Sequence, residues 1–159
     1  MKSLYIDPGK HRCGVALFVD AVLEWADWVP SGDVPGLVVR EAPDVVLMEN
    51  PKDYARFAVA HKDLDSLRAV LASASKAAKK VGARVEKVSP SEWKGNVPKP
   101  VHHNRVMQAL DARERALMET FGAVGSTKYE AGGHNTWDAV ALGMFGTKRL
   151  GRGGKKEGS

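Results

Sequence analysis

Near its amino terminus the chain contains Ser3-Leu4-Tyr5-Ile6-Asp7-Pro8-Gly9, a short apolar run that ends at an acidic residue and a Pro-Gly turn. A second apolar run follows at residues 13–18, and a third at residues 22–29 comes after a link of two residues. Apolar runs separated by tight turns are typical of neighbouring antiparallel strands. The amino-terminal part of the chain therefore predicts a three-stranded meander.

Two further strands are predicted in the middle of the chain. Residues 44–49 form a nearly continuous apolar run that ends at Glu49, a pattern typical of a strand buried on both faces of a sheet. Residues 84–88 form the last strand and stop at Ser89-Pro90. A right-handed crossover would lay residues 44–49 parallel to the first strand. We therefore expect an α/β protein with a mixed five-stranded sheet in the order 3-2-1-4-5, flanked by helices.

The flanking helices are predicted from the spacing of apolar side chains. Residues 64–81 place them at three- and four-residue steps and end before Gly82, as an amphipathic helix does. Residues 101–121 follow a helical pattern with a break near Asp111. A final helix is predicted over residues 135–150.

The connections differ from these elements in composition. Residues 30–43 contain Gly and Pro and predict a loop with one helical turn at residues 37–41. Residues 122–133 contain four glycines and are expected to be mobile. Residues 151–159 are expected to form a flexible basic tail that is too polar to pack. Residues 1–150 are then expected to form a single domain.

The overall composition favours a globular protein with a polyanionic partner. A chain of 159 residues with 43% hydrophobic residues can bury a core without disulfides. Its 24 Lys and Arg against 19 Asp and Glu give a formal net charge of +5, which favours nucleic acid. The single cysteine, Cys13, is expected in the core and suits a reducing compartment. No apolar run approaches the roughly 18 residues of a membrane span, so we expect a cytoplasmic protein.

Three acidic residues are candidates for a metal site. Asp7 and Glu49 end two strands that are predicted to lie side by side, and Asp138 opens the apolar part of the last helix. Open α/β sheets place their sites at the carboxyl ends of their strands. Carboxylates packed together repel one another unless cations hold them, and hard oxygen ligands suit Mg²⁺ or Mn²⁺. On a basic chain this arrangement predicts metal-dependent phosphodiester chemistry.

Each carboxylate also has a simpler interpretation. Asp7 precedes Pro-Gly and could start a turn, whereas Glu49 would be costly near a core unless it is paired or metal-bound. Asp138 could complete a capping box in which Asn135 is the N-cap. His134 and Asn135 would share a helix face with Asp138 if that helix begins early.

Other polar residues carry weaker signals. Lys94 lies in a loop that mixes Lys, Trp and Gly, and it belongs either to a site or to a solvated loop. His102 and His103 have no Cys or His partner at the spacing of a zinc site. The helical methionines are expected to fill the core: Met107, Met118 and Met144. The basic residues near the carboxyl end either solubilise the chain or contact phosphate: Lys148, Arg149, Arg152, Lys155 and Lys156.

Taken in order, these motifs resemble the RuvC family of Holliday-junction resolvases. The run Leu4-Tyr5-Ile6-Asp7-Pro8-Gly9, followed by Gly14-Val15-Ala16, is similar to the first strand of that family. Glu49 is similar to its second acidic position. Its Pro-x-x-x-Lys stretch is matched by Pro90-Ser91-Glu92-Trp93-Lys94, and its last-helix motif by Asp138-Ala139-Val140-Ala141-Leu142.

The resemblance implies an RNase H-like fold and a crossover junction endodeoxyribonuclease. Such an enzyme resolves four-way DNA junctions with paired symmetric nicks, acts as a homodimer and uses two Mg²⁺ or Mn²⁺ ions per active site. By resemblance, the metal ligands would be Asp7, Glu49 and Asp138, with His134 as the fourth. Lys94 would lie near the scissile phosphate. The small size and the basic tail suit a phage-type member.

Two departures from the family pattern leave questions open. The family has an Asp or a His three residues before its last Asp, where this chain has Asn135, so the fourth ligand is either His134 or Asn135. The family also has an aromatic residue after its Glu that wedges into the junction. Tyr54 and Phe57 are the nearest candidates here, and both could instead pack under a loop.

Three other functions remain to be weighed. An RNase H-type ribonuclease that cuts RNA in hybrids would share the fold, and a non-catalytic junction-binding protein would explain the departure at Asn135. A nucleotide binder of the sugar-kinase and actin type shares the strand plan. The chain is too short for the two lobes of that class and lacks its second Gly-rich strand pair.

Overall fold

The computed structural model describes residues 1–50, 61–95, 97–120 and 133–150, and it leaves the side chains of residues 61–62, 99, 120 and 133–135 undescribed. The strands are β1 (Lys2–Asp7), β2 (Arg12–Val19), β3 (Val22–Pro30), β4 (Val45–Glu49) and β5 (Arg84–Val88).

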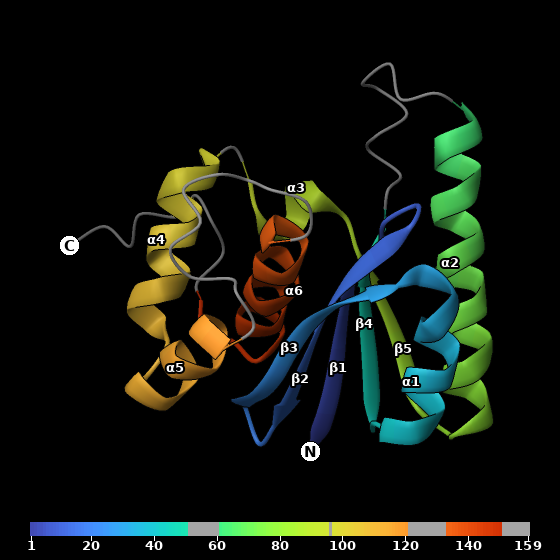
Figure 1. Cartoon of the computed structure of the whole chain (residues 1–159), viewed down its shortest axis with the longest axis horizontal. Helices are drawn as coiled ribbons and strands as arrows, with labels where there is room; N and C mark the ends of the chain where they lie inside the picture. The colour runs from blue at the N-terminus through green and yellow to red at the C-terminus, as the bar shows by residue number, and fades with distance from the viewer. Residues whose placement is uncertain (51–60, 96, 121–132, 151–159) are drawn as a thin grey trace.

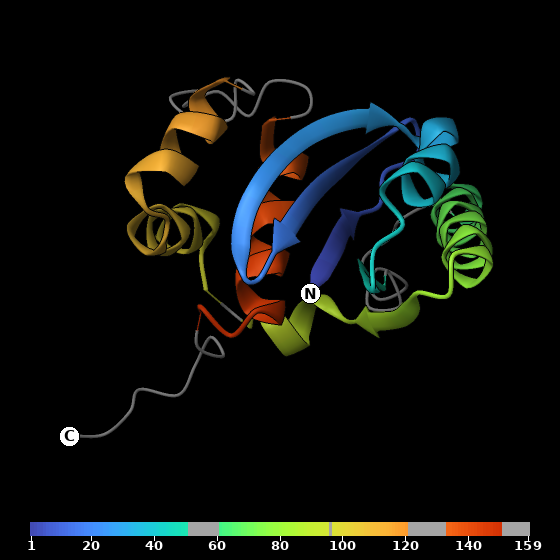
Figure 2. The same cartoon turned by 90° about the horizontal axis from the view of Figure 1, so that it is seen from below.

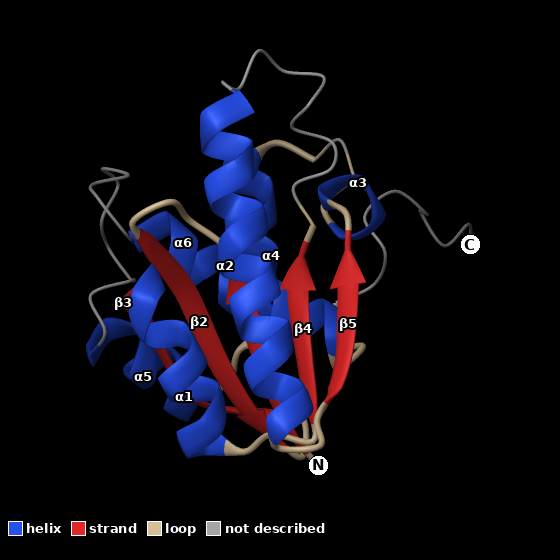
Figure 3. Ribbon diagram, turned by 90° about the vertical axis from the view of Figure 1, so that its right-hand side faces the viewer, coloured by secondary structure: helices blue, strands red, loops and turns tan. Residues whose placement is uncertain are grey.

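These strands form one mixed sheet in the order β3-β2-β1-β4-β5. β2 pairs antiparallel with both β1 and β3, whereas β4 pairs in parallel with both β1 and β5. Figure 3 shows β4 and β5 side by side, with their arrowheads at the same edge of the sheet. The predicted sheet and its strand order are confirmed.

The helices are a 3-10 turn (Ser31–Asp33), α1 (Val34–Glu41), α2 (His61–Lys80), α3 (Pro90–Trp93), α4 (Lys99–Ala109), α5 (Ala112–Thr120) and α6 (Gly133–Gly146). The break near Asp111 is confirmed, since it separates α4 from α5. Where a single helical turn was expected, α1 is a full helix of eight residues. It forms because Leu37 and Val38 bury an apolar stripe, which outweighs the Gly and Pro in its sequence.

The helices cover the two faces of the sheet in different ways. α1 and α2 pack side by side on one face, and α6 packs across β1, β2 and β3 on the other. Figures 1 and 2 show α4 and α5 outside α6, so that side has an additional layer. No described helix is both long and apolar enough to cross a membrane.

Strand alternation divides the buried side chains into two cores. Leu4 and Ile6 of β1 face α1 and α2, whereas Tyr5 faces α6. Cys13 is fully buried in β2, as expected. The expectation for the methionines also holds, because Met118 and Met144 are fully buried and Met107 packs against the core from a half-buried position.

Glycines let α6 approach the sheet closely. A Cβ atom at Gly143 would lie 2.2 Å from a ring carbon of Phe18, and one at Gly146 would lie 2.5 Å from the ring of Tyr5. Both distances are shorter than any normal contact, so larger residues would push the helix outward. The small residues therefore fix the distance between α6 and the strands that end in the candidate site.

The last helix differs from its prediction at both ends. It begins at Gly133, so Asp138 is its sixth residue and lies inside the helix. The predicted capping box, with Asn135 as the N-cap and Asp138 at the third helical position, is therefore wrong. The helix ends at Gly146, and Lys148 adopts a left-handed conformation with a φ of 62° that turns the chain back.

Arg149 has a structural role that the sequence did not indicate. Its guanidinium donates hydrogen bonds to both carboxylate oxygens of Glu114 and to the carbonyl oxygens of Ala109 and Ala21, at 2.7 and 3.1 Å. These contacts tie the end of α6 to α5 and to the β2–β3 turn. The interpretation of Arg149 as a solubilising or phosphate-binding residue is wrong, because its charge is used inside the fold.

Candidate active site

Asp7 and Glu49 lie side by side at the carboxyl edge of the sheet. The parallel register of β1 and β4 pairs Ile6 with Met48, so each acidic residue follows a paired position. By strand alternation Asp7 shares the face of Tyr5, which packs in the core beneath α6. Glu49 likewise shares the face of Leu47, which packs in the same core. The two carboxylates are therefore placed on the α6 side of the sheet.

Asp138 brings the third carboxylate from α6. The helix crosses the face of the sheet that carries Asp7 and Glu49, and it does so at close range because of its glycines. Asp7, Glu49 and Asp138 are only 6%, 1% and 5% exposed. Burying three carboxylates near one another is costly unless positive charge accompanies them. The structure thus brings together three of the predicted ligands.

Lys94 supplies positive charge to these carboxylates. The chain leaves β5 at Val88, turns at Ser89-Pro90 into α3, and the amide of Lys94 closes that turn on the carbonyl of Pro90 at 2.8 Å. Its ammonium lies 3.2 Å from Oε2 of Glu49 and 3.7 Å from Oδ2 of Asp138. Figure 3 shows α3 at the edge where β4 and β5 end. The prediction that Lys94 could belong to a solvated loop is wrong.

The pKa of Lys94 depends on all three carboxylates. Burial lowers the pKa of its ammonium, but the charges of Asp138, Glu49 and Asp7 outweigh burial and raise the pKa above its usual value. Lys94 is thus protonated, and its ammonium is the described cation that bridges Glu49 and Asp138.

Two aromatic side chains contact the carboxylates or their neighbours. The indole Nε1 of Trp93 donates a hydrogen bond of 3.0 Å to Oε2 of Glu49. His103 of α4 stacks on Trp137, with ring centroids 5.4 Å apart, and its Nε2 lies 4.0 Å from Oδ1 of Asp138. Sequence reasoning missed both residues: the only signals were that Trp93 precedes Lys94 and that a His pair lies on the next helix.

The donor set fits a hard divalent cation in its chemistry. It consists of carboxylate oxygens from β1, β4 and α6, which are rigid elements. In the described part of the chain, no three His, Cys, Asp or Glu side chains form a ready-made metal cluster. Instead the Lys94 ammonium bridges Glu49 and Asp138.

The remaining predicted residues are only partly described. The backbone of His134 and Asn135 lies in α6, four and three residues before Asp138, because the helix begins early. Their side chains lie outside the described residues, as do Tyr54 and Phe57 and the glycine-rich segment and basic tail.

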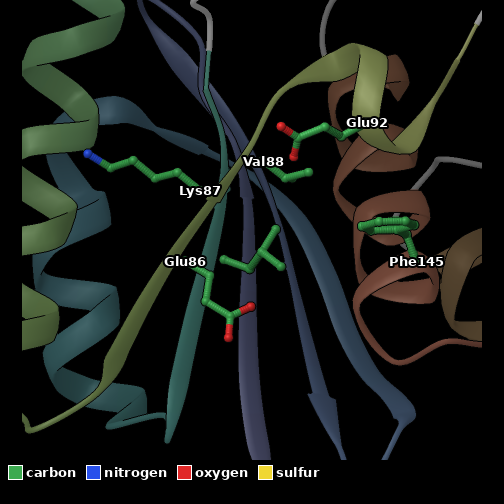
Figure 4. Close-up of a pocket in the computed structure, with 6 residues that line it drawn as sticks. Glu86, Lys87, Val88, Glu92 and Phe145 are labelled. Carbon is green, nitrogen blue, oxygen red and sulfur yellow. The ribbon is translucent and has the colours of Figure 1, made fainter.

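A surface pocket lies beside the site and has a different character. It has a volume of about 340 Å³ and lies between β5, α3 and α6, where Figure 4 shows Glu92 and Phe145 facing the strand. Its lining residues are Leu47, Glu86, Lys87, Val88, Glu92 and Phe145. Two glutamates against one lysine in the lining disfavour a phosphate ligand in this pocket.

Solved structures with the same fold come from RuvC of Thermus thermophilus. A structure of T. thermophilus RuvC in complex with Holliday junction substrate has a TM-score of 0.54 and 18% identity, covering 96% of this chain and 97% of that one. Another T. thermophilus RuvC structure has a TM-score of 0.57 and 16% identity, covering 96% and 98%. No protein-family model and no curated protein matches the sequence. The chain has an RNase H-like fold as in RuvC.

Proposed function

We propose that this protein is a structure-selective DNA endonuclease that resolves four-way junctions by divalent-metal-dependent hydrolysis. The observation that carries the proposal is the convergence of Asp7, Glu49 and Asp138 from three elements onto one lysine. Buried carboxylates that converge from rigid elements offer the hard oxygen ligands that divalent cations prefer. Asp7 and Glu49 end β1 and β4, and α/β proteins keep their sites at the carboxyl ends of such strands.

The metal ligands in this proposal are Asp7, Glu49 and Asp138, with His134 as the fourth. Two Mg²⁺ or Mn²⁺ ions, when bound, would activate a water and stabilise the leaving oxygen of the phosphodiester. The three carboxylates would fix the orientation of the site, because each is held on a strand or helix packed in the core. His134 is kept as the proposed fourth ligand, with Asn135 as the alternative, because they lie four and three residues before Asp138 in α6.

Lys94 would contact the substrate in addition to the carboxylates. Its side chain is 22% exposed, whereas those of Glu49 and Asp138 are 1% and 7% exposed, so Lys94 is the more accessible partner of these ion pairs. A protonated amine beside the scissile phosphate stabilises the negative charge that develops in the transition state. We therefore assign Lys94 to phosphate stabilisation.

DNA is the proposed partner because of charge and position. Lys10 is exposed in the connection that follows Asp7, and Arg12 is exposed at the start of β2. Without DNA they contact Asp63 and the ring of Trp28, and the chain has a formal net charge of +5. Basic side chains next to the site neutralise phosphates and make binding dependent on salt. A homodimer with two such sites would cut two strands symmetrically. The likeness of this fold to a structure of RuvC in complex with Holliday junction substrate supports a four-way junction as the substrate.

The test is a cleavage assay on three labelled substrates: a four-way junction, a linear duplex and an RNA/DNA hybrid. We expect paired nicks in the junction with Mg²⁺ or Mn²⁺, and no nicks in either metal-free buffer or the duplex. Preferential cleavage of the hybrid would replace the proposal with a ribonuclease of the RNase H type. Tight junction binding without incision in either metal would support a non-catalytic junction-binding protein.

A further inference from the structure

Trp93 is the buried aromatic residue that contacts both partners of the central ion pair. Its indole nitrogen donates to Oε2 of Glu49 at 3.0 Å, and the ammonium of Lys94 lies over its ring, 4.7 Å from the centroid. Oε2 of Glu49 is also the oxygen that Lys94 contacts at 3.2 Å. Trp93 therefore defines one side of the space in which these two charges meet.

The packing around Trp93 makes it a rigid support. The side chain is only 2% exposed and belongs to the core beneath α6. The ring of His102 meets it edge-on from α4, with centroids 5.3 Å apart and planes at 64°. A side chain that is buried and packed against a neighbouring ring holds its N–H in a fixed direction, and thereby holds the carboxylate that accepts from it.

Core packing alone would not require this contact. A phenylalanine or leucine would also fill an apolar site, and it would bring no polar hydrogen that needs a partner. The indole N–H meets that need with the carboxylate at the end of β4, and the ring face offers Lys94 a cation–π contact. The hydrogen bond requires the indole N–H, whereas the cation–π contact requires only an aromatic ring.

We infer that Trp93 is a positioning residue for the metal ligand Glu49 and for Lys94, an inference that rests on the proposed function. Trp93 holds Glu49 through Oε2 and thereby sets the orientation in which the carboxylate can bind a cation. Its ring also holds the Lys94 ammonium beside the site through the cation–π contact. Residues that orient metal ligands in this way change metal affinity roughly 10- to 100-fold when they are replaced.

The test compares Trp93→Phe with Trp25→Phe. The first variant keeps a ring for Lys94 and removes the N–H, whereas the second removes an indole that packs half-buried on the opposite core. Calorimetric titration with Mg²⁺ alone, without DNA, gives the dissociation constant at a temperature where thermal unfolding shows each variant to be folded. We expect Trp93→Phe to weaken Mg²⁺ binding roughly 10-fold or more, and Trp25→Phe to leave it unchanged.

A second variant covers the case in which Trp93→Phe does not fold. A tryptophan analogue at position 93, with sulfur in place of the indole N–H, keeps the shape of the side chain and removes only the donor. It should weaken Mg²⁺ binding in the same direction. Unchanged Mg²⁺ affinity in either folded variant overturns the inference.

The results also separate the inference from the proposed function. If the wild type cuts junctions and Trp93→Phe binds Mg²⁺ as tightly as the wild type, the inference fails and the function stands. If the wild type binds Mg²⁺ through Trp93-dependent contacts but leaves every junction intact, the function fails and the inference stands. A wild type that binds no Mg²⁺ overturns both.

Discussion

Two buried charged clusters lie on opposite ends of α6, and they differ in how their charges are matched. Near the carboxyl end, Glu114 is fully buried and accepts hydrogen bonds from Arg149 and from the amides of Leu23 and Asp111, at 2.9 and 2.8 Å. In that cluster one buried carboxylate is paired with one guanidinium. Near the amino end, three carboxylates meet Lys94.

The difference supports the proposal that the first cluster serves stability and the second serves function. Glu114 and Asp111 cap the start of α5 reciprocally, since each side chain accepts from the other's amide, at 2.8 Å in both cases. A matched, fully hydrogen-bonded pair of this kind ties elements together. An excess of buried carboxylates costs stability in the protein alone, and such a cost is typical of binding sites.

The largest expected effect is loss of stability from Arg149→Met. The variant leaves the buried carboxylate of Glu114 without its guanidinium, which costs about 3–5 kcal/mol in comparable cases. Urea unfolding measures the free energy of unfolding. Arg113→Met is the matched control, because its partner Glu24 is exposed and such surface pairs contribute about 0–1 kcal/mol. Equal losses in the two variants would contradict a structural role for the buried cluster.

Lys94→Met should lower stability in a way that depends on Mg²⁺. Without Lys94 the three carboxylates repel one another, and we expect a loss of about 2 kcal/mol in EDTA. Saturating Mg²⁺ should restore stability, since a ligand that binds only the folded state shifts the unfolding equilibrium.

Thermal unfolding of Lys94→Met with and without Mg²⁺ checks this expectation. Lys76→Met is the control, because Lys76 is exposed on α2 and its loss changes the net charge equally. If Mg²⁺ stabilises Lys94→Met no more than the control, the excess of negative charge at the site does not attract the metal.

Gly143→Ala tests the close approach of α6. The added methyl would lie 2.2 Å from the ring of Phe18, and overpacking of this kind costs about 1–3 kcal/mol. The displaced helix should also lower junction cleavage, because Asp138 moves with it. Gly36→Ala in α1 is the control: its methyl meets nothing within 4 Å, so helix propensity should stabilise the fold by up to about 1 kcal/mol. The same sign for both substitutions would contradict this account.

The smallest effect is expected in the pH dependence of stability. Burial raises the pKa of Glu114, but hydrogen bonds from Arg149 and from the two amides outweigh burial and lower the pKa. A lowered pKa means that the contribution of Glu114 is complete above the pKa of an unfolded glutamate, about 4.3, and is lost as the pH falls through the folded pKa.

Urea unfolding of the wild type and Glu114→Gln between neutral and acid pH measures this contribution. The stability difference between the two proteins should shrink as the pH drops below about 4. A difference that stays constant down to pH 2 would show that the charge of Glu114 adds nothing to stability.

The sheet could be predicted from the sequence because the patterns that specify its strands lie within short segments. The apolar runs of β1, β4 and β5 and the turns after them specify strands, and a right-handed crossover then fixes the strand order. The same strand order predicts that Asp7 and Glu49 lie at one edge of the sheet. Asp138 followed from the motif that opens the last helix.

The parts that were missed depend on contacts between distant segments. The four-residue helix α3 is too short to leave a periodic pattern, so the contact of Trp93 with Glu49 had no sequence signal. His103 reaches Asp138 only because α4 packs on α6. The role of Arg149 requires Glu114, 35 residues earlier, to be buried beside it.

The most direct test of the central claim is cleavage of a labelled four-way junction by the wild type and by Asp7→Asn in Mg²⁺. The substitution keeps the size of a side chain that is 6% exposed, so thermal unfolding and junction binding should stay close to those of the wild type. We predict that cleavage falls at least about a thousandfold, which corresponds to about 4 kcal/mol in the barrier. Cleavage by Asp7→Asn at the wild-type rate would contradict the assignment of the carboxylates to metal-dependent hydrolysis.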